Sequence, residues 1–175
     1  QHPHMGLDFG ADHLQARLNA TGPCDGCRRV FFNGLNGSRC FRIPSIIRTN
    51  IGTLLAFAEA RWRGCEDWRG GRHSLVLRRS TDGGYQWGPM HIVFESQNES
   101  ISNPSPVEVI RQNRTRAVLL HFVTMNNPTV ERHGRAMQIW STDDGLTWHS
   151  VSVIEYPPLA NRGGLVGPSI GLQSS

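Results

Sequence analysis

Hydrophobic residues beyond residue 40 occur in short runs and not in long periodic stretches. Runs of five to eight residues, rich in Ile, Val, Leu and Phe, alternate with clusters of turn-forming residues. This alternation is typical of β-strands, and no stretch keeps the 3.6-residue period of an amphipathic helix over a helical length. The chain is therefore predicted to be all-β, with strands at residues 43–48, 53–60, 73–80, 90–96, 107–111, 117–124, 135–141 and 149–154.

The predicted strands fall into two sets of four that repeat. The octapeptide STDGGYQW at 80–87 reappears as STDDGLTW at 141–148, an offset of 61 residues. The starts of the two sets, 44–46 and 106–108, match at an offset of 62 residues. A four-stranded unit that repeats at this length is typical of a β-propeller blade.

The repeat predicts how the chain is divided. Residues 1–39 are expected to form an irregular N-terminal arm, and residues 40–175 the N-terminal part of a propeller. We expect blade one at about 41–96, blade two at about 105–155, and the start of a third blade at about 167.

A propeller closes with about four to eight blades, so the remaining blades are expected to be missing from this chain. The chain also starts at Gln1 without the apolar core of a signal peptide, and we interpret it as a partial or processed product. By itself it is expected to fold poorly, because it would expose apolar surface and unpaired strand edges.

Charge and hydropathy exclude two classes of partner. The net charge is +4, and all 18 basic residues are arginine. These arginines are scattered without a tract of five or more, which argues against nucleic-acid binding. No apolar run approaches the roughly 18–20 residues that a membrane span needs.

Four cysteines leave several arrangements open. The Cys24-x-x-Cys27 pair suggests either a metal site or a redox pair. Cys40 and Cys65 lie too far apart in sequence to form the second ligand pair of a zinc site. Disulfides in an oxidising compartment are the better interpretation, and three pairings are open. No metal ligand set is predicted.

Four Asn-x-Ser/Thr sequons point to the same compartment. Together with an even number of cysteines, they favour the secretory pathway, with a lysosomal or extracellular location. The candidate glycosylation sites are Asn19, Asn36, Asn98 and Asn113.

Two arginines and a carboxylate are expected to meet at one rim of the first sheet. Arg42 and Arg61 end two adjacent apolar runs, and a hairpin would bring them together near Asp67. A planar guanidinium group matches a carboxylate bidentately, and a carboxyl group nearby can act as an acid. The cluster fits a site that binds a carboxylate-bearing ligand. The structural alternative pairs Arg42 with Glu59 or Asp67.

The repeated octapeptide has a structural interpretation. Its Asp and Gly make a tight turn, in which Asp82 and Asp143 accept backbone N–H groups. Trp87 and Trp148 are expected to pack beneath as hydrophobic anchors. We predict no catalytic role for these turns.

Three segments together resemble the sialidase (neuraminidase) family. They are FRIP at 41–44, GTLLAFAEAR at 52–61 and LVLRRSTDGGYQW at 75–87, and their wording is similar to animal exo-sialidases, most of all the lysosomal branch. The octapeptide resembles that family's Asp box, with Gln86 in place of Thr in the first copy. The resemblance covers about residues 40–175.

This resemblance implies a fold and an activity. The whole protein would be a six-bladed propeller and an exo-α-sialidase that needs no cofactor. It would hydrolyse terminal sialic acids from glycoproteins, glycolipids or oligosaccharides with retention of configuration, and could associate with membranes through its substrates.

The matching motifs also imply roles for individual residues of this chain. Arg42 resembles the first arginine of the triad that binds the sialic acid carboxylate. Arg61 resembles a further pocket arginine, with Arg63 as the alternative if the register is shifted. Asp67 resembles the acid/base aspartate, for which Glu66 and Glu59 are rivals.

The surroundings of the acid/base residue carry further expectations. Asp67 should be shielded from water to hold its proton, and Trp62 and Trp68 are candidates for that shielding. Asn103, in Asn-Pro-Ser-Pro, resembles a loop residue that borders the ligand pocket, and a plain Pro-rich turn is the equal alternative.

The family's nucleophile is expected to lie outside this chain. Sialidases use a tyrosine nucleophile, and neither Tyr85 nor Tyr156 stands in its context. The resemblance places that tyrosine, its glutamate and two further arginines in later blades, so the 175-residue chain by itself is expected to be inactive. A non-catalytic sialic-acid-binding module and an Asp-box scaffold propeller are the alternatives.

Overall fold

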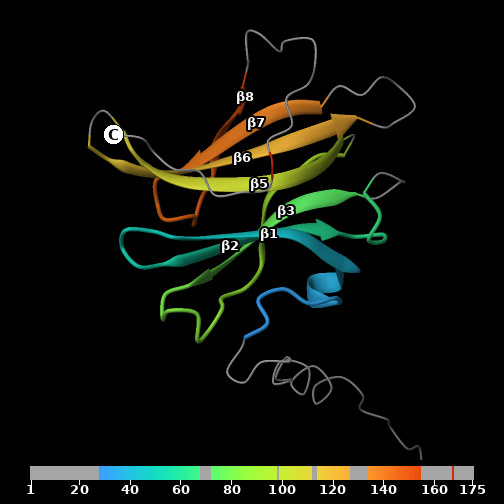
Figure 1. Ribbon diagram of the computed structural model, residues 1–175, viewed down its shortest axis with the longest axis horizontal. Coiled ribbons are helices and arrows are strands. Elements are labelled where there is room, and N and C mark those ends of the chain that lie inside the picture. Colours follow the sequence, from blue (N-terminus) through green and yellow to red (C-terminus); the bar gives the residue numbers. More distant parts are fainter. Residues whose placement is uncertain are drawn as a thin grey trace, which may run out of the picture.

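The computed structural model describes residues 28–67, 72–97, 99–111, 114–126, 134–154 and 167. These residues form two four-stranded antiparallel sheets, which face one another as two layers (Figure 1). The first sheet has the order β1-β2-β3-β4 and the second β5-β6-β7-β8. The strands are β1 (Cys40–Arg48), β2 (Leu54–Arg61), β3 (His73–Ser80), β4 (His91–Glu95), β5 (Glu99–Ile110), β6 (Arg116–Asn126), β7 (Gly134–Ser141) and β8 (His149–Val153).

The all-β prediction and the two sets of four strands are confirmed. Each sheet is a simple meander in which neighbouring strands in sequence are neighbours in space. No helix in the described part of the chain is long and apolar enough to cross a membrane.

Strand β5 begins earlier than the sequence predicted. It starts at Glu99 instead of at residue 107, so Asn103 and Pro104 lie within a strand and not in a loop or Pro-rich turn before it. The pairing of β5 with β6 is interrupted between Ser102 and Ser105, where a bulge accommodates the proline without ending the strand.

The same bulge occurs in β1. Pairing with β2 is interrupted between residues 42 and 45, and Ile43 has φ 51°. In β5 Asn103 has φ 60°, so the two bulges share a backbone conformation that is uncommon for residues other than glycine. Pro44 therefore corresponds to Pro104, and the predicted match of Pro44 with Pro106 was wrong.

The main core lies between the two sheets. Aromatic contacts join the layers: Phe57 meets Trp148 edge-on with ring centroids 5.8 Å apart, and Phe94 lies 4.6 Å from Phe122. Trp148 belongs to the second Asp box, so its predicted role as a hydrophobic anchor is confirmed. The buried residues of this core are Leu55, Phe57, Leu75, Leu77, Ile101, Val118, Leu120, Phe122, Met137 and Ile139.

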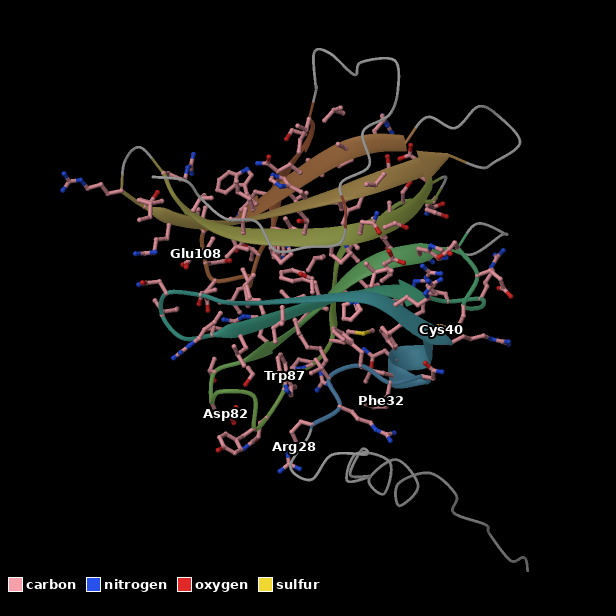
Figure 2. The ribbon with its side chains drawn as sticks, viewed as in Figure 1. Arg28, Phe32, Cys40, Asp82, Trp87 and Glu108 are labelled. Carbon is pink, nitrogen blue, oxygen red and sulfur yellow. A yellow bond between two sulfur atoms is a disulfide. The ribbon has the colours of Figure 1, made fainter. Side chains whose placement is uncertain are left out.

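The Asp-box turns have the predicted hydrogen bonds. Asp143 Oδ1 accepts the Thr147 backbone N–H at 2.8 Å, and Asp82 Oδ1 accepts the Gln86 N–H at 3.0 Å. Partial desolvation raises the pKa of Asp143, but hydrogen bonds from Thr147 and Ser141 outweigh it and bring that pKa to about 2. Figure 2 shows Asp82 and Trp87 away from Cys40. Cys40 pairs with Arg61, and Arg61 pairs with His73 at the start of β3, whereas the first Asp box lies at the end of β3.

The described part of the N-terminal arm packs on the outer face of the first sheet. It contains one short 3-10 helix, η1 (Leu35–Gly37), which carries the exposed sequon residue Asn36. Phe31 stacks on Phe41 at 5.3 Å, and Arg78 donates to the Val30 carbonyl at 2.8 Å. The arm thus covers a second apolar cluster formed by Ala58, Ala60, Val76 and Met90.

Several predicted features lie outside the described residues. They are the segment 168–175, the Cys24-x-x-Cys27 pair, the sequons at Asn19, Asn98 and Asn113, and the residues Trp68 and Tyr156. Of the predicted third blade, Gly167 alone is described.

Candidate functional site

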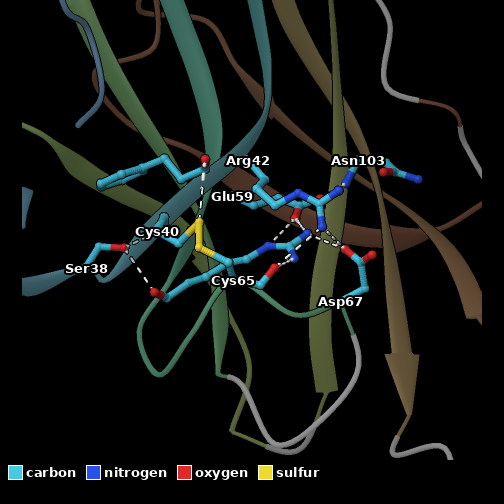
Figure 3. Close-up of polar contacts among 9 residues, drawn as sticks. Ser38, Cys40, Arg42, Glu59, Cys65, Asp67 and Asn103 are labelled. Carbon is cyan, nitrogen blue, oxygen red and sulfur yellow. Dashed lines mark hydrogen bonds and ion pairs between the residues drawn. A yellow bond between two sulfur atoms is a disulfide. The ribbon is translucent and has the colours of Figure 1, made fainter. Parts of the chain in front are cut away.

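The hairpin of β1 and β2 brings the predicted arginines to one rim. Cys40 pairs with Arg61, and Arg42 pairs with Glu59. Directly paired residues, and residues two apart on a strand, point to the same face of a sheet. All four side chains therefore lie on one face of the first sheet. Figure 3 labels Cys40, Arg42 and Glu59 among them.

Both arginines converge on the carboxylate of Asp67. Arg42 Nη1 lies 2.6 Å from Asp67 Oδ1, and Arg61 Nη2 lies 2.9 Å from the same oxygen. The side chains of Arg42 and Asp67 are 41% and 50% exposed, whereas that of Arg61 is 2% exposed. The site therefore combines a buried guanidinium group, that of Arg61, with a solvent-facing one, that of Arg42.

Glu59 holds Arg61 from behind. Its Oε2 accepts from Arg61 Nε at 3.0 Å and from Arg61 Nη2 at 2.5 Å. Its Oε1 accepts the Asn103 backbone N–H at 2.9 Å, which ties the buried ion pair to the bulge of β5 in the second sheet. Glu59 therefore supports Arg61, and its burial makes it inaccessible as an acid.

The loop after β2 supplies the remaining contacts. The Cys65 carbonyl accepts from Arg61 Nη1 at 2.7 Å and from Arg42 Nη1 at 3.5 Å. Cys65 also forms a disulfide with Cys40, which resolves one of the pairings that the sequence left open. Arg63 is exposed in this loop, whereas Arg61 is buried.

The charge of Asp67 differs from the sequence expectation. Its hydrogen bond with Arg61 lowers the pKa of its carboxyl group below the ordinary value; slight desolvation opposes this, and the hydrogen bond with Arg42 adds to it. At neutral pH and without ligand the half-exposed carboxylate is therefore anionic, in contrast to the shielded acid that was expected to hold its proton. Trp68, one candidate for the shielding, lies outside the described residues. Trp62 gives no shielding, because its Nε1 donates to Ser74 Oγ at 2.9 Å and its ring packs on the outer face of the sheet.

The sequence analysis missed one buried residue of the site. His73 begins β3 directly opposite Arg61 and is fully buried. Burial, and then the charge of Arg61, lower the pKa of His73, so at neutral pH it adds no charge beneath the arginines. Its position before an apolar strand, opposite an expected arginine, is the one signal that could have found it.

Two other candidates have defined places. Asn103 lies at the β5 bulge next to Glu59, and Glu66 is exposed beside Asp67 without an ion pair to either arginine among those found in the described residues. The described part of the chain contains no group of three or more His, Cys, Asp or Glu side chains placed to hold a metal ion.

Comparison with curated proteins shows that this chain is similar in sequence to sialidases. The chain is 30% identical over 132 residues to a sialidase of Micromonospora viridifaciens, covering 66% of this chain and 20% of that protein. It is 30% identical over 134 residues to a sialidase of Bacteroides fragilis (66% and 24%) and 29% identical over 139 residues to an exo-alpha-sialidase of Aspergillus fumigatus (64% and 32%). No family model matches the chain.

Two solved structures with a similar fold are a sialidase and an intramolecular trans-sialidase. The NanB sialidase of Streptococcus pneumoniae has a TM-score of 0.70 at 12% identity, covering 93% of this chain and 43% of that one. The leech intramolecular trans-sialidase has a TM-score of 0.69 at 14% identity, covering 93% and 42%.

The matches define the resemblance and its extent. The chain spans about a fifth to a third of the length of the curated relatives. These relatives are bacterial and fungal and do not single out the animal lysosomal branch. The two sheets are blades of a sialidase-type β-propeller, and the comparisons support the sialidase family as the family that this chain resembles.

Proposed function

We propose that this chain forms the carboxylate-binding and acid/base part of an exo-α-sialidase site. Arg42 and Arg61 would bind the carboxylate of a terminal sialic acid on a glycoprotein, glycolipid or oligosaccharide. Asp67 would protonate the departing glycosidic oxygen and then activate water, with retention of configuration. Asn103 would border the pocket.

One observation carries the proposal: two guanidinium groups from neighbouring strands converge on a single carboxylate oxygen. Asp67 Oδ1 accepts from both Arg42 and Arg61, in the position that a ligand carboxylate would take. Charge-assisted hydrogen bonds of this kind are among the strongest that a protein makes to a carboxylate. Arg61 is already fixed by Glu59, so little order is lost when a ligand binds.

Exchange of carboxylates would convert Asp67 into an acid. A sialic acid carboxylate that takes the place of Asp67 removes the two contacts that lower its pKa. It also brings a negative charge close to Asp67, which favours the protonated form. Ligand binding would thus raise the pKa of Asp67, so that its carboxyl group is protonated when the substrate is bound.

The nucleophile would come from the remaining blades. Tyr85 is 75% exposed in the first Asp-box turn, at the opposite end of the first sheet from Arg61, which supports its exclusion. The Cys40–Cys65 disulfide supports a location in the secretory pathway, lysosomal or extracellular, since disulfides persist in oxidising compartments.

A binding module without catalysis is the second candidate. The lowered pKa of Asp67 favours this candidate, because an anionic aspartate can occupy the two arginines when no ligand is bound without ever donating a proton. Both candidates share the arginine pair, and turnover separates them.

Binding of sialic acid tests the arginine pair. We expect N-acetylneuraminic acid to shift the Nε–H signals of Arg42 and Arg61 in an NMR titration, and its methyl ester to have little effect, because the ester carries no charge. Arg42→Gln should weaken binding at least tenfold, since hydrogen bonds to charged groups contribute about 1.5–3 kcal/mol.

Arg135→Gln is the matched control, because Arg135 is also an exposed arginine paired with a carboxylate, that of Glu99, but in the second sheet. It should leave the affinity unchanged. Equal binding of the acid and its ester, or equal effects of the two substitutions, would reject the proposed site.

A further inference from the structure

We infer that the Cys40–Cys65 disulfide is a positioning device for the acid/base loop, which holds Asp67 on the two arginines and is released by a dithiol reductant. The inference rests on the proposed function for the role of Asp67, but the tether itself can be measured without any ligand.

Both ends of the disulfide lie next to the site. Cys40 begins β1 two residues before Arg42, and Cys65 lies two residues before Asp67. The carbonyl of Cys65 accepts from both arginines, at 2.7 Å from Arg61 and 3.5 Å from Arg42. Figure 3 shows the sulfur bridge beside this group of contacts. The disulfide therefore holds a polar acceptor, and the carboxylate that follows it, over the guanidinium pair.

The folded hairpin does not need this bond to keep its register. Cys40 is already paired with Arg61 in the ladder of β1 and β2. Ser38 Oγ, which is buried, donates to the carbonyls of Cys40 and Arg61, at 2.9 and 3.3 Å, and fixes the same end of the hairpin. What the disulfide adds in the folded state is a constraint on the four residues that follow Arg61 and on the loop they begin.

The other restraints on this loop are polar contacts. Trp62 N–H donates to the carbonyl of Arg72, the residue before β3, at 3.2 Å, the Cys65 carbonyl accepts from Arg61, and the Glu66 backbone interacts with His73. Cys65, Glu66 and Asp67 are exposed, in contrast to the buried anchor Cys40. With the disulfide open, these contacts and the ion pairs of Asp67 alone would hold the loop, and the ion pair with the exposed Arg42 competes with water.

Release follows ordinary thiol–disulfide exchange. A thiolate of the dithiol attacks one sulfur, the Cys40–Cys65 bond breaks, and the departing cysteine thiolate takes a proton from water. The second thiol of the reductant then displaces the other cysteine. Two electrons pass to the protein, which gains two thiols, and the reductant becomes a cyclic disulfide.

The test follows the pKa of Asp67 in the intact chain. In a Cys24→Ser/Cys27→Ser background the Cys40–Cys65 pair is the one that a dithiol can reduce, and ¹³C-carboxyl NMR reports each aspartate. Asp67 should titrate below 3.8 when oxidised and move up toward 3.8 when reduced. Amide signals of β1, β2 and β3 should stay in place, and reoxidation should restore the first titration.

A second variant keeps the disulfide and adds slack. Two glycines inserted between Glu66 and Asp67 should raise the pKa of Asp67 as reduction does, with the strands intact. In the Cys40→Ser/Cys65→Ser variant the pKa of Asp67 should equal that of the reduced chain, and the reductant should not change it.

An unchanged pKa of Asp67 in the reduced, folded chain would overturn the inference. If reduction unfolds the strands, the glycine variant decides, and an unchanged pKa there overturns it equally. Failure of sialic acid to bind would refute the proposed function alone, since this titration contains no ligand.

Discussion

Replacing Arg61 with methionine is expected to lower the free energy of unfolding by about 3–5 kcal/mol, because it leaves a buried carboxylate without its counterion. Arg61 and Glu59 are both buried, and Oε2 of Glu59 accepts two hydrogen bonds from the arginine. After the substitution, Glu59 keeps the single backbone donor from Asn103. Urea denaturation followed by tryptophan fluorescence measures the change.

A matched ion pair on the surface is the control. Arg135 is 51% exposed and pairs with Glu99 at 2.6 Å, so Arg135→Met should cost less than about 1 kcal/mol. The double change Glu59→Leu with Arg61→Met should recover much of the loss, since apolar groups of similar volume can replace a buried pair. Equal costs for Arg61→Met and Arg135→Met would show that the buried pair does not stabilise the fold.

The substitution Asp67→Asn is expected to reduce sialoside turnover by about 10²–10⁴-fold, the usual contribution of a positioned general acid or base. Asparagine keeps the size of the side chain and an oxygen for Arg42 and Arg61, but it cannot deliver a proton. Binding of an unreactive sialic acid analogue should therefore stay nearly intact. The assay uses a fluorogenic sialoside and a polypeptide in which this chain continues into further blades.

The neighbouring carboxylate is the control for that experiment. Glu66→Gln should leave turnover nearly unchanged, because Glu66 is exposed next to the cluster of Arg42, Arg61 and Asp67. A loss with Glu66→Gln and none with Asp67→Asn would transfer the acid/base role to Glu66. Full activity of both variants would reject a carboxyl acid in this loop.

Much of the fold could be predicted from the sequence because strand patterns are local. Short apolar runs and the repeated Asp box located all eight strands and their division into two sheets. The exception was β5, where Pro104 resembles a turn residue. A bulge with Asn103 at positive φ lets the strand continue, and the pairing with β6 that makes this possible is a tertiary feature.

The site could be predicted in part for the same reason. A two-residue period and a hairpin suffice to place Arg42 and Arg61 on one rim. The bond from Glu59 to Asn103 crosses between sheets, and the Cys40–Cys65 pairing depends on the path of a loop. The anionic state of Asp67 depends on two arginines that reach it at the same time, and no local pattern shows that.

The central claim is that Arg42 and Arg61 hold the carboxylate of a sialic acid in the place that Asp67 occupies without ligand. A crystal structure with 2-deoxy-2,3-dehydro-N-acetylneuraminic acid tests it most directly. We predict that the ligand carboxylate lies within hydrogen-bond distance of both guanidinium groups and that Asp67 has left Arg42. A ligand bound elsewhere, with the Arg42–Asp67 ion pair still in place, would contradict the account.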